Sequence, residues 1–425
     1  MTGKTTSRWR KLTRFIGPGF VSGASGDDPA GIATFSQAGA GFGYGMGWTM
    51  LFSFPLMSAV QYISGSIGAA TGKGVAGNLK DRYPAWILQT LALLVFLSNT
   101  ITVGADIGAM GAATALLIPL QPFVFVVAYG VLSVLLISFL KYRTYSRYLK
   151  WLGLSLLAYV ASAAAAGTDW RAALTGFVLP TFSADPKWLA IIVAILGTSI
   201  SPYLVFWEAS QEVQREKDEG DSHHRKALKD HPVSGRHERR RLRADTIFGM
   251  AVSQLVGAFI IVTCAATLHQ QGHTDIKSAA EAAAALEPIA GRLTSLIFAA
   301  GIVGTGLLAV PVLAGSAAFA LGEEFGWKVG LDLTPRRAKA FYGIIALATG
   351  LGIALNLVGV NVIDFLIASA IINGIVELPV IVMMMLVARD RKVMGDFALT
   401  WPWRILGWLT LAVMAAAAAG MALTL

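Results

Sequence analysis

The sequence predicts an all-α polytopic membrane protein. Of its 425 residues, 55% are hydrophobic and only 14% are charged, whereas soluble domains carry about a quarter charged residues. The single cysteine, Cys264, allows no intrachain disulfide and no cysteine metal cluster. The net charge of +9 would suit nucleic acid, but its distribution along the chain favours a membrane. We therefore predict a lipid bilayer as partner, with no nucleic acid, no cofactor and no enzymatic activity.

Apolar stretches recur along the whole chain. A spanning helix needs about 20 consecutive apolar residues, and eleven stretches are long enough. They fall at 15–40, 45–72, 86–118, 121–140, 149–166, 187–212, 245–268, 292–321, 340–357, 361–387 and 402–424. We predict eleven transmembrane helices that follow an N-terminal segment at 1–14.

Positive charge follows alternate connections between these stretches. Of the 34 Lys and Arg residues, all but Arg171, Lys187, Lys277 and Arg292 lie on one predicted side. Cytoplasmic loops carry the excess of Lys and Arg. The pattern therefore predicts a multi-pass protein of the cell inner membrane or plasma membrane, with a cytoplasmic N-terminus and an external C-terminus.

Two connections have a distinct composition. Residues 213–244 are strongly polar and basic, so we predict a solvated, flexible cytoplasmic loop there, although its histidines could also bind metal. On the other side, residues 277–288 read KSAAEAAAALEP, which indicates a short amphipathic helix against the outer surface.

The first apolar stretch is interrupted near its middle. Residues 25–31 read Ser-Gly-Asp-Asp-Pro-Ala-Gly. Proline removes a backbone donor and glycine loosens the backbone, so an unbroken helix is disfavoured here. Broken backbone at membrane depth is tolerated only where protein or a water-filled cavity covers it, and an acid there marks a functional site by default.

The sixth stretch contains a second interruption. Residues 197–203 read Gly-Thr-Ser-Ile-Ser-Pro-Tyr. An offset of five stretches makes the two broken helices cross in opposite directions. Such paired breaks are the best sequence pointer to a transporter site between inverted repeats. We predict a first repeat over 15–166, a second over 187–387 and one extra helix at 402–424.

The chain resembles the NRAMP divalent-metal transporters. The resemblance lies in residues 17–48, in the Ala-Asp-Ile-Gly-Ala-Met-Gly of 105–111, in the second break, in 283–307 and in the Glu-Leu-Pro of 377–379. It covers nearly the whole chain. It implies the LeuT-like fold, a five-plus-five inverted repeat with helices 1 and 6 broken, and a divalent metal ion as substrate.

Departures from the family pattern bear on the substrate. Asp28 matches the family's metal-binding aspartate, but Gly31 stands at its asparagine, and Ser201-Pro202-Tyr203 replaces Met-Pro-His. Oxygen ligands suit Mg²⁺ and Mn²⁺, whereas sulfur favours softer ions. Mg²⁺ keeps several waters, which a site widened at Gly31 would admit. The departures resemble those of the NRAMP-related magnesium transporters, so Mg²⁺, with Mn²⁺ beside it, is the predicted substrate.

The predicted metal site combines charge from the first break with oxygens freed at both breaks. Its members are Asp28, Ser25, Gly31, Thr198, Ser201 and Asp27. Whether Asp27 reaches the ion or faces a neighbouring polar group stays open.

Four further residues are assigned to the ion pathway: Tyr203, Glu208, Asp106 and Asn373. For Glu208 a structural hydrogen bond is the alternative, and for Glu377 packing and an ion role are equally open. All six histidines fall in predicted loops. In the family, protons move through the sixth-helix histidine and an acidic pair, here reduced to Asp106 with Ala109. We therefore predict transport without proton coupling.

Three other classes are weighed against this one. A proton-coupled Mn²⁺/Fe²⁺ importer of conventional NRAMP type lacks its methionine and histidine here. An amino-acid transporter of the same fold would bring a carboxylate against paired aspartates. A channel or membrane sensor would need a filter loop or a regulatory domain that the sequence does not show. The oligomeric state is not predictable from the sequence.

Overall fold

The computed structural model describes residues 19, 22–23, 26–80, 82–140, 156–219 and 232–424. Every regular element in these residues is a helix. The first part of the described chain contains α3 (Pro29–Phe42), η1 (Gly43–Met46), α4 (Trp48–Thr71), α5 (Val75–Leu79), α6 (Ala85–Ala115), α7 (Pro122–Phe139), α9 (Leu157–Ala165) and α10 (Trp170–Val178). The second part contains α11 (Pro186–Ser199), α12 (Pro202–Glu219), α13 (Pro232–Cys264), η4 (Ala265–His269), α14 (Ala279–Ala284), α15 (Glu287–Ala290), η5 (Gly291–Leu293), α16 (Thr294–Phe325), α17 (Lys339–Leu355), η6 (Asn356–Val358), α18 (Val362–Ala388), α19 (Arg391–Met394), η7 (Gly395–Phe397) and α20 (Trp401–Thr424).

Within these residues nine helical segments are long and apolar enough to cross a membrane. They match nine of the eleven predicted stretches, with α11 and α12 forming one broken span over Pro186–Glu216. The other two predicted stretches, 15–40 and 149–166, lie partly outside the described residues. Their described parts include the helices α3 and α9. Eleven spans therefore stay a prediction.

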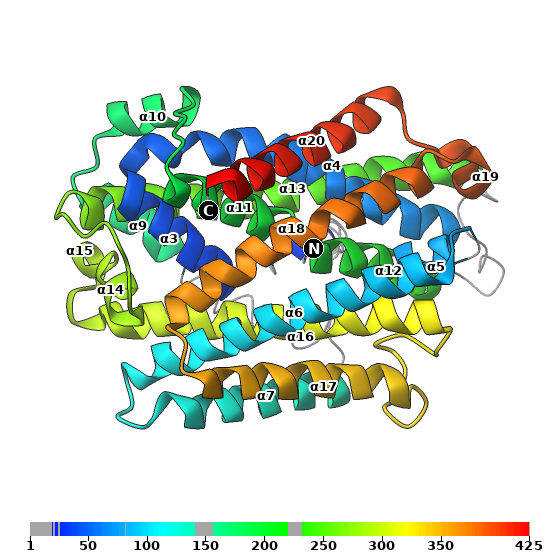
Figure 1. Cartoon of the computed structure of the whole chain (residues 1–425), viewed down its shortest axis with the longest axis horizontal. Helices are drawn as coiled ribbons and strands as arrows, with labels where there is room; N and C mark the ends of the chain where they lie inside the picture. The colour runs from blue at the N-terminus through cyan, green and yellow to red at the C-terminus, as the bar shows by residue number, and fades with distance from the viewer. Residues whose placement is uncertain are drawn as a thin grey trace, which may run out of the picture.

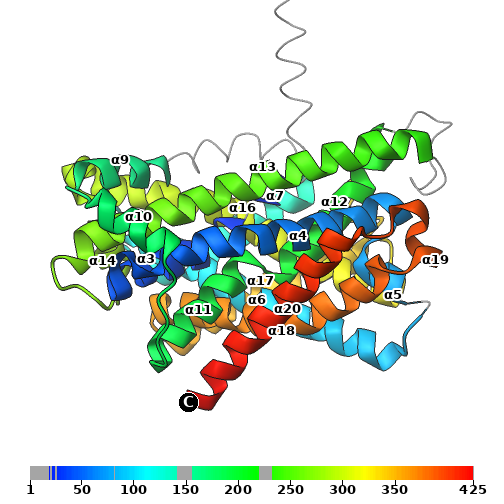
Figure 2. The same ribbon diagram turned by 90° about the horizontal axis from the view of Figure 1, so that it is seen from above.

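The long helices run side by side (Figures 1 and 2), and their contacts occur in related pairs. α12 packs on α4 as α3 packs on α13, and α6 packs on α17 as α16 packs on α7. In each pair, replacing both helices of one contact by the helices five predicted spans away along the chain gives the other contact. This is the pairing that an inverted repeat predicts, although the exact repeat boundaries stay predictions.

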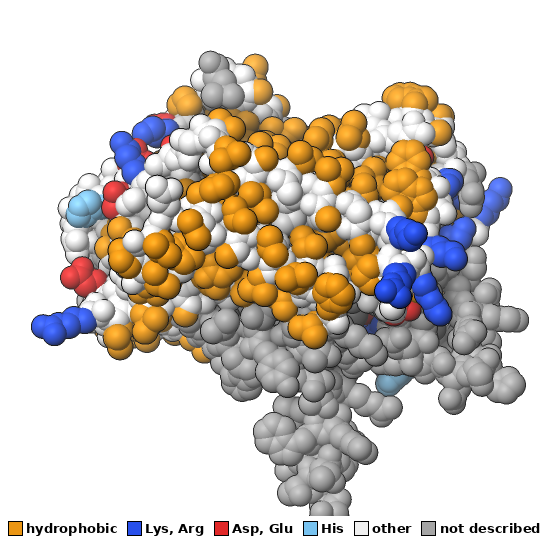
Figure 3. Space-filling model, turned by 90° about the horizontal axis from the view of Figure 1, so that it is seen from below, with side chains coloured by type: hydrophobic (Ala, Val, Ile, Leu, Met, Phe, Trp, Pro, Cys, Tyr) orange, Lys and Arg blue, Asp and Glu red, His pale blue; other side chains and the backbone are white. Residues whose placement is uncertain are grey.

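The outer face carries apolar side chains in a broad band, with charged side chains gathered at its ends (Figure 3). α7 and α17 form this edge of the molecule in Figure 1. They expose large hydrophobic residues, among them Val124, Leu135 and Leu347. An apolar surface of this extent is stable in lipid but not in water, so the protein is a multi-pass membrane protein.

The polar segment predicted as a loop over 213–244 is helical at both of its ends. α12 continues to Glu219 and α13 starts at Pro232, so the flexible-loop prediction was too wide. Charge pairing explains the difference. Arg215 contacts Glu238 at 2.6 Å, and Arg241 contacts Glu212 at 2.8 Å, so the charges neutralise one another between the two helices. Residues 220–231, with three of the loop's histidines, lie outside the described residues.

The predicted amphipathic helix over 277–288 is seen as two short pieces, α14 and α15. Ser278 caps α14 by accepting a hydrogen bond from the Glu281 amide at 3.2 Å. The Glu281 carboxylate in turn accepts a hydrogen bond from the Lys277 amide at 2.9 Å. Reciprocal bonds of this kind satisfy the free donors at a helix start.

Candidate functional site

The two predicted breaks meet inside the bundle. At the first, Asp27 and Asp28 leave the helical conformation before α3 begins at Pro29. At the second, α11 ends at Ser199 and α12 begins at Pro202. The breaks touch through a hydrogen bond from the Tyr203 hydroxyl to Asp28 Oδ2, at 3.2 Å.

Asp28 is placed by the local sequence. Aspartate is a preferred N-cap and proline a preferred first helical residue, so Asp-Pro starts a helix. Its Oδ1 accepts a bond from the Gly31 amide at 2.7 Å. Asp185-Pro186 starts α11 in the same way, but Asp185 is exposed, whereas Asp28 is only 1% exposed. Burial therefore distinguishes Asp28 from an ordinary cap.

Three oxygen atoms converge beside Gly31. A Cβ built on this glycine would lie 3.0 Å from Thr198 Oγ1, 3.3 Å from Asp28 Oδ1 and 3.4 Å from the Gly26 carbonyl oxygen. Carboxylate, hydroxyl and carbonyl oxygens are ligands for hard divalent cations. The predicted widening at Gly31 is not observed, because these oxygens already surround the position of the missing side chain.

Thr198 Oγ1 lies within hydrogen-bonding reach of Asp28, whereas Asp106 Oδ2 has no hydrogen-bond partner within the described residues. Both residues are buried. Asp106 Oδ1 accepts from the Ala30 amide at 3.2 Å, which places its carboxylate beside the start of α3, next to Asp28. Buried polar groups are normally bonded, and an oxygen left without a donor is suited to a cation.

The Ser201 hydroxyl bonds the backbone at the end of α11. It donates to the Gly197 carbonyl oxygen at 2.5 Å and lies 3.1 Å from the Thr198 carbonyl oxygen. It thus satisfies carbonyls left free where α11 ends. Its oxygen keeps lone pairs, so a ligand role stays a prediction, but the hydroxyl already bonds the helix end.

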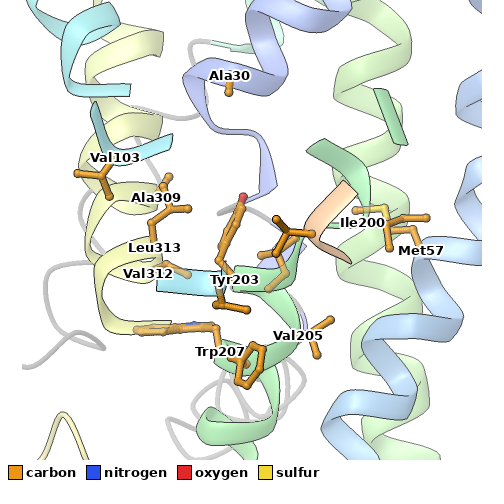
Figure 4. Close-up of a cluster of buried hydrophobic side chains, with 14 of the residues drawn as sticks. Ala30, Met57, Val103, Ile200, Tyr203, Val205, Trp207, Ala309, Val312 and Leu313 are labelled. Atoms are coloured by element: carbon orange, nitrogen blue, oxygen red, sulfur yellow. The ribbon is translucent and has the colours of Figure 1, made fainter. Parts of the chain in front are cut away.

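Tyr203 projects from α12 toward the first break (Figure 4). Apolar residues flank it, including Leu313 on α16 and Ile200 before α12. The ring is fully buried, so its hydroxyl presents the one polar atom of the side chain to Asp28. Tyr203 therefore lies beside Asp28, and its role in the ion pathway stays a prediction.

Asp27 points to another partner. Its Oδ1 accepts from the Ser253 hydroxyl on α13 at 2.7 Å. This oxygen of Asp27 therefore faces a neighbouring polar group, which is one of the two alternatives that the sequence left open. Ser25 lies outside the described residues, so its assignment stays a prediction.

The remaining pathway residues lie on either side of the site. Asn373 on α18 accepts from Ser98 and donates to Thr102 at 3.1 Å, so both ends of its amide are engaged on α6. Glu208 on α12 accepts from the Ser22 hydroxyl at 2.5 Å. This bond ties the first half-helix to α12 on the side where the basic connections lie.

Two features lie on opposite sides of the site. Toward α14, a small apolar cavity is lined by residues of α3, α6, α14, α16 and α18, including Ile32, Ala282 and Phe298. Toward the α12–α13 junction, the Gly19 amide donates to Asp245 at 2.9 Å, and Ser22 donates to Glu208.

The sequence did not identify the Gly26 carbonyl, Ser253 or Asp245. Gly26 directly precedes the paired aspartates, which was a usable signal for a freed carbonyl. Ser253 and Asp245 lie in the middle of a continuous helix more than 200 positions away, and only the fold brings them to the first break.

Comparisons with known proteins agree with this architecture. The family model described as natural resistance-associated macrophage protein-like, Nramp, matches residues 19–424. The divalent metal cation transporter MntH of Klebsiella pneumoniae is 25% identical over 412 residues, covering 94% of this chain and 91% of its own. A manganese transporter of Eremococcus coleocola superposes with a TM-score of 0.76 at 17% identity, covering 98% of this chain and 87% of its own. Mhp1 in its inward-facing conformation gives 0.55 at 12% identity, covering 96% and 90%.

Proposed function

The chain belongs to the natural resistance-associated macrophage protein-like (Nramp) family, and from this membership and the site geometry we propose that it transports divalent metal ions across a membrane by alternating access. One observation carries the proposal. A buried carboxylate oxygen of Asp28, the hydroxyl oxygen of Thr198 and the Gly26 carbonyl oxygen surround a single point between two broken helices.

The chemistry of these oxygens supports a cation as the substrate. Asp28 supplies the charge, and Asp106 adds a second carboxylate beside the start of α3. Two like charges buried together are costly unless a cation or a proton lies between them. A divalent ion with one or two retained waters would satisfy both.

The identity of the ion is the finer question. The sequence favoured Mg²⁺, but the relatives include MntH proteins and a manganese transporter, which support the Mn²⁺/Fe²⁺ alternative better. Oxygen ligands suit Mn²⁺ as well as Mg²⁺, so the loss of the methionine does not exclude manganese. We therefore propose Mn²⁺ as the first substrate to test and Mg²⁺ as the second.

Coupling and direction are proposals of the same kind. The missing sixth-helix histidine favoured uncoupled transport, but the comparisons support the proton-coupled alternative better than that reading. Import into the cytoplasm, with the N-terminus inside, rests on the alternation of basic connections. The membrane potential alone contributes about 4.6 kcal/mol per 100 mV for a divalent ion, twice the value for a single charge.

The test is uptake by the purified full chain in liposomes with an imposed inside-negative potential. Mn²⁺, Mg²⁺, Ca²⁺ and Cd²⁺ are supplied singly and in competition, with the internal pH recorded. We expect saturable Mn²⁺ uptake that Mg²⁺ reduces. A folded protein that moves none of the four ions would overturn the proposal, and uptake of Mg²⁺ unaffected by Mn²⁺ would restore the magnesium reading.

A further inference from the structure

A second buried carboxylate lies apart from the oxygen cluster. Glu377, near the middle of α18, is fully buried, and within the described residues neither of its side-chain oxygens has a hydrogen-bond partner. The buried acids near the two breaks each have a donor, as Asp28 has Gly31 and Glu208 has Ser22. Glu377 is thus unlike the acids of the site.

The charged side chains of the neighbouring helices do not pair with Glu377 either. The helices that pack on α18 are α3, α4, α5, α6, α11, α12, α19 and α20. Among described side chains, their charged residues are Asp106, Lys187, Glu208, Glu212, Arg215, Glu216, Arg391, Lys392 and Arg404. None of these side chains forms a hydrogen bond with the Glu377 carboxylate. An ionised carboxylate in such surroundings is strongly unfavourable.

The position of Glu377 is close to the transport site along α18. Gly374 packs directly on Gly197 at the end of α11, where a Cβ on Gly374 would lie 3.2 Å from the Gly197 Cα. Gly197 is the residue before Thr198. Glu377 follows Gly374 by three residues, which is a rise of about 4.5 Å along the helix. Movement of α18 against α11 would therefore displace both.

From these contacts we propose that Glu377 is a proton-binding site that takes up and releases one proton in each transport cycle. A proton needs a single carboxylate oxygen, whereas a metal ion needs several ligands. Within the described residues, neither oxygen of Glu377 has a polar partner that could serve as a second ligand. The proton would come from water on one side of the membrane and leave to water on the other, with Glu377 neutral while it is buried.

The proposal rests on the proposed function only for its transport measurements. It also supplies what the sequence lacks, because Tyr203 cannot serve as the histidine of a proton relay near neutral pH. Asn373, one turn before Glu377, bonds Ser98 and Thr102 on α6. These contacts hold α18 against α6 without providing a donor to Glu377.

The experiment compares wild type with Glu377→Gln in liposomes that contain a pH-sensitive dye. Mn²⁺ uptake is driven by an inside-negative potential, and the acidification that accompanies it is measured together with the dependence of uptake on external pH. We expect at least about a tenfold fall in protons moved per Mn²⁺ and a flattened pH profile, with Mn²⁺ uptake retained. The matched control is Glu324→Gln, which removes another buried carboxylate with an unpartnered oxygen, near the end of α16.

Infrared difference spectra of the wild type give a readout that does not depend on transport. A protonated carboxylic acid absorbs apart from a carboxylate, and we expect such a band to shift with Mn²⁺ binding and to disappear in Glu377→Gln. If that variant does not fold, Glu377→Asp should keep both the band and the proton movement. Unchanged proton movement in folded Glu377→Gln, or a wild type that moves Mn²⁺ without protons, would overturn the proposal. Absence of all metal uptake with the band present would instead contradict the proposed function alone.

Discussion

The two helix breaks solve opposite problems with different side chains. At the first, the Asp28 carboxylate accepts a bond from an amide at the start of α3. At the second, the Ser201 hydroxyl donates to carbonyls at the end of α11. One break therefore presents negative charge, and the other closes its free carbonyls with a neutral group.

This difference assigns unequal roles to the breaks. Charge attracts a divalent ion over a distance and dominates its binding, whereas neutral oxygens adjust its coordination. Thr198 is the exception at the second break, since its hydroxyl oxygen lies beside Asp28 at the position of the missing Gly31 side chain. The first break should determine whether an ion binds, and the second should determine which ion is preferred.

The largest effect is expected for Asp28→Asn. The amide keeps an oxygen for the Gly31 bond but removes the charge, so Mn²⁺ uptake should fall at least about 100-fold, equivalent to about 2.8 kcal/mol. Uptake by purified protein in liposomes measures this. Asp185→Asn is the control, because it changes the same Asp-Pro helix start at an exposed position. Normal uptake by folded Asp28→Asn would show that charge at the first break is not required.

A smaller effect is expected for Thr198→Val. Valine has nearly the same shape and lacks the hydroxyl, so it removes one oxygen from the cluster beside Gly31. The affinity for Mn²⁺ should fall about tenfold, or about 1.4 kcal/mol, with thermal stability unchanged. Binding calorimetry and a melting curve test both parts.

The control for Thr198 is Thr100→Val. Its hydroxyl bonds only the Phe96 carbonyl of its own helix at 2.7 Å, so Mn²⁺ affinity should stay at the wild-type value. Equal affinity in Thr198→Val and wild type would remove the second break from the metal site.

These residues also show how far sequence reasoning reaches. Asp28, Pro29 and Pro202 act through local rules for starting a helix, so both breaks were predictable to within a residue or two. The paired breaks and the family resemblance placed Tyr203 and Asp28 in the same region, but the hydrogen bond between them was not predicted. Local rules explain why the fold was largely predictable.

What failed depended on distant packing. The oxygens beside Gly31 come from both breaks, so a glycine that suggested empty space is in fact crowded. The sequence left open whether Asp27 faces a neighbouring polar group but could not name Ser253, and the charges of 213–244 pair between α12 and α13. Neither partner can be read from spacing, because the tertiary fold alone sets which side chains on separate helices meet.

Ion preference is the next comparison, with a smaller expected change. Ser201→Met removes the donor to the Gly197 and Thr198 carbonyls and adds a thioether, which favours softer ions. We expect Cd²⁺ to compete with Mn²⁺ several-fold better than in wild type, about 1 kcal/mol in relative affinity. Competition uptake measures the ratio. Ser201→Ala separates the two causes, since it frees the same carbonyls without sulfur. An equal shift in both variants would assign the preference to the carbonyls.

The smallest effect is expected for Asp27→Asn, and it tests whether the first break contains one functional charge or two. Asparagine can still accept the Ser253 bond through its side-chain oxygen, so packing against α13 is preserved. If Asp27 serves that contact alone, Mn²⁺ affinity should change by no more than about twofold, within the range of a surface-like substitution. Calorimetry on Asp27→Asn beside Asp28→Asn gives the comparison in one experiment. A loss as large as that of Asp28→Asn would mean that both carboxylates hold the ion, and Ser253→Ala should then leave the affinity intact, because the metal would position Asp27 without the serine.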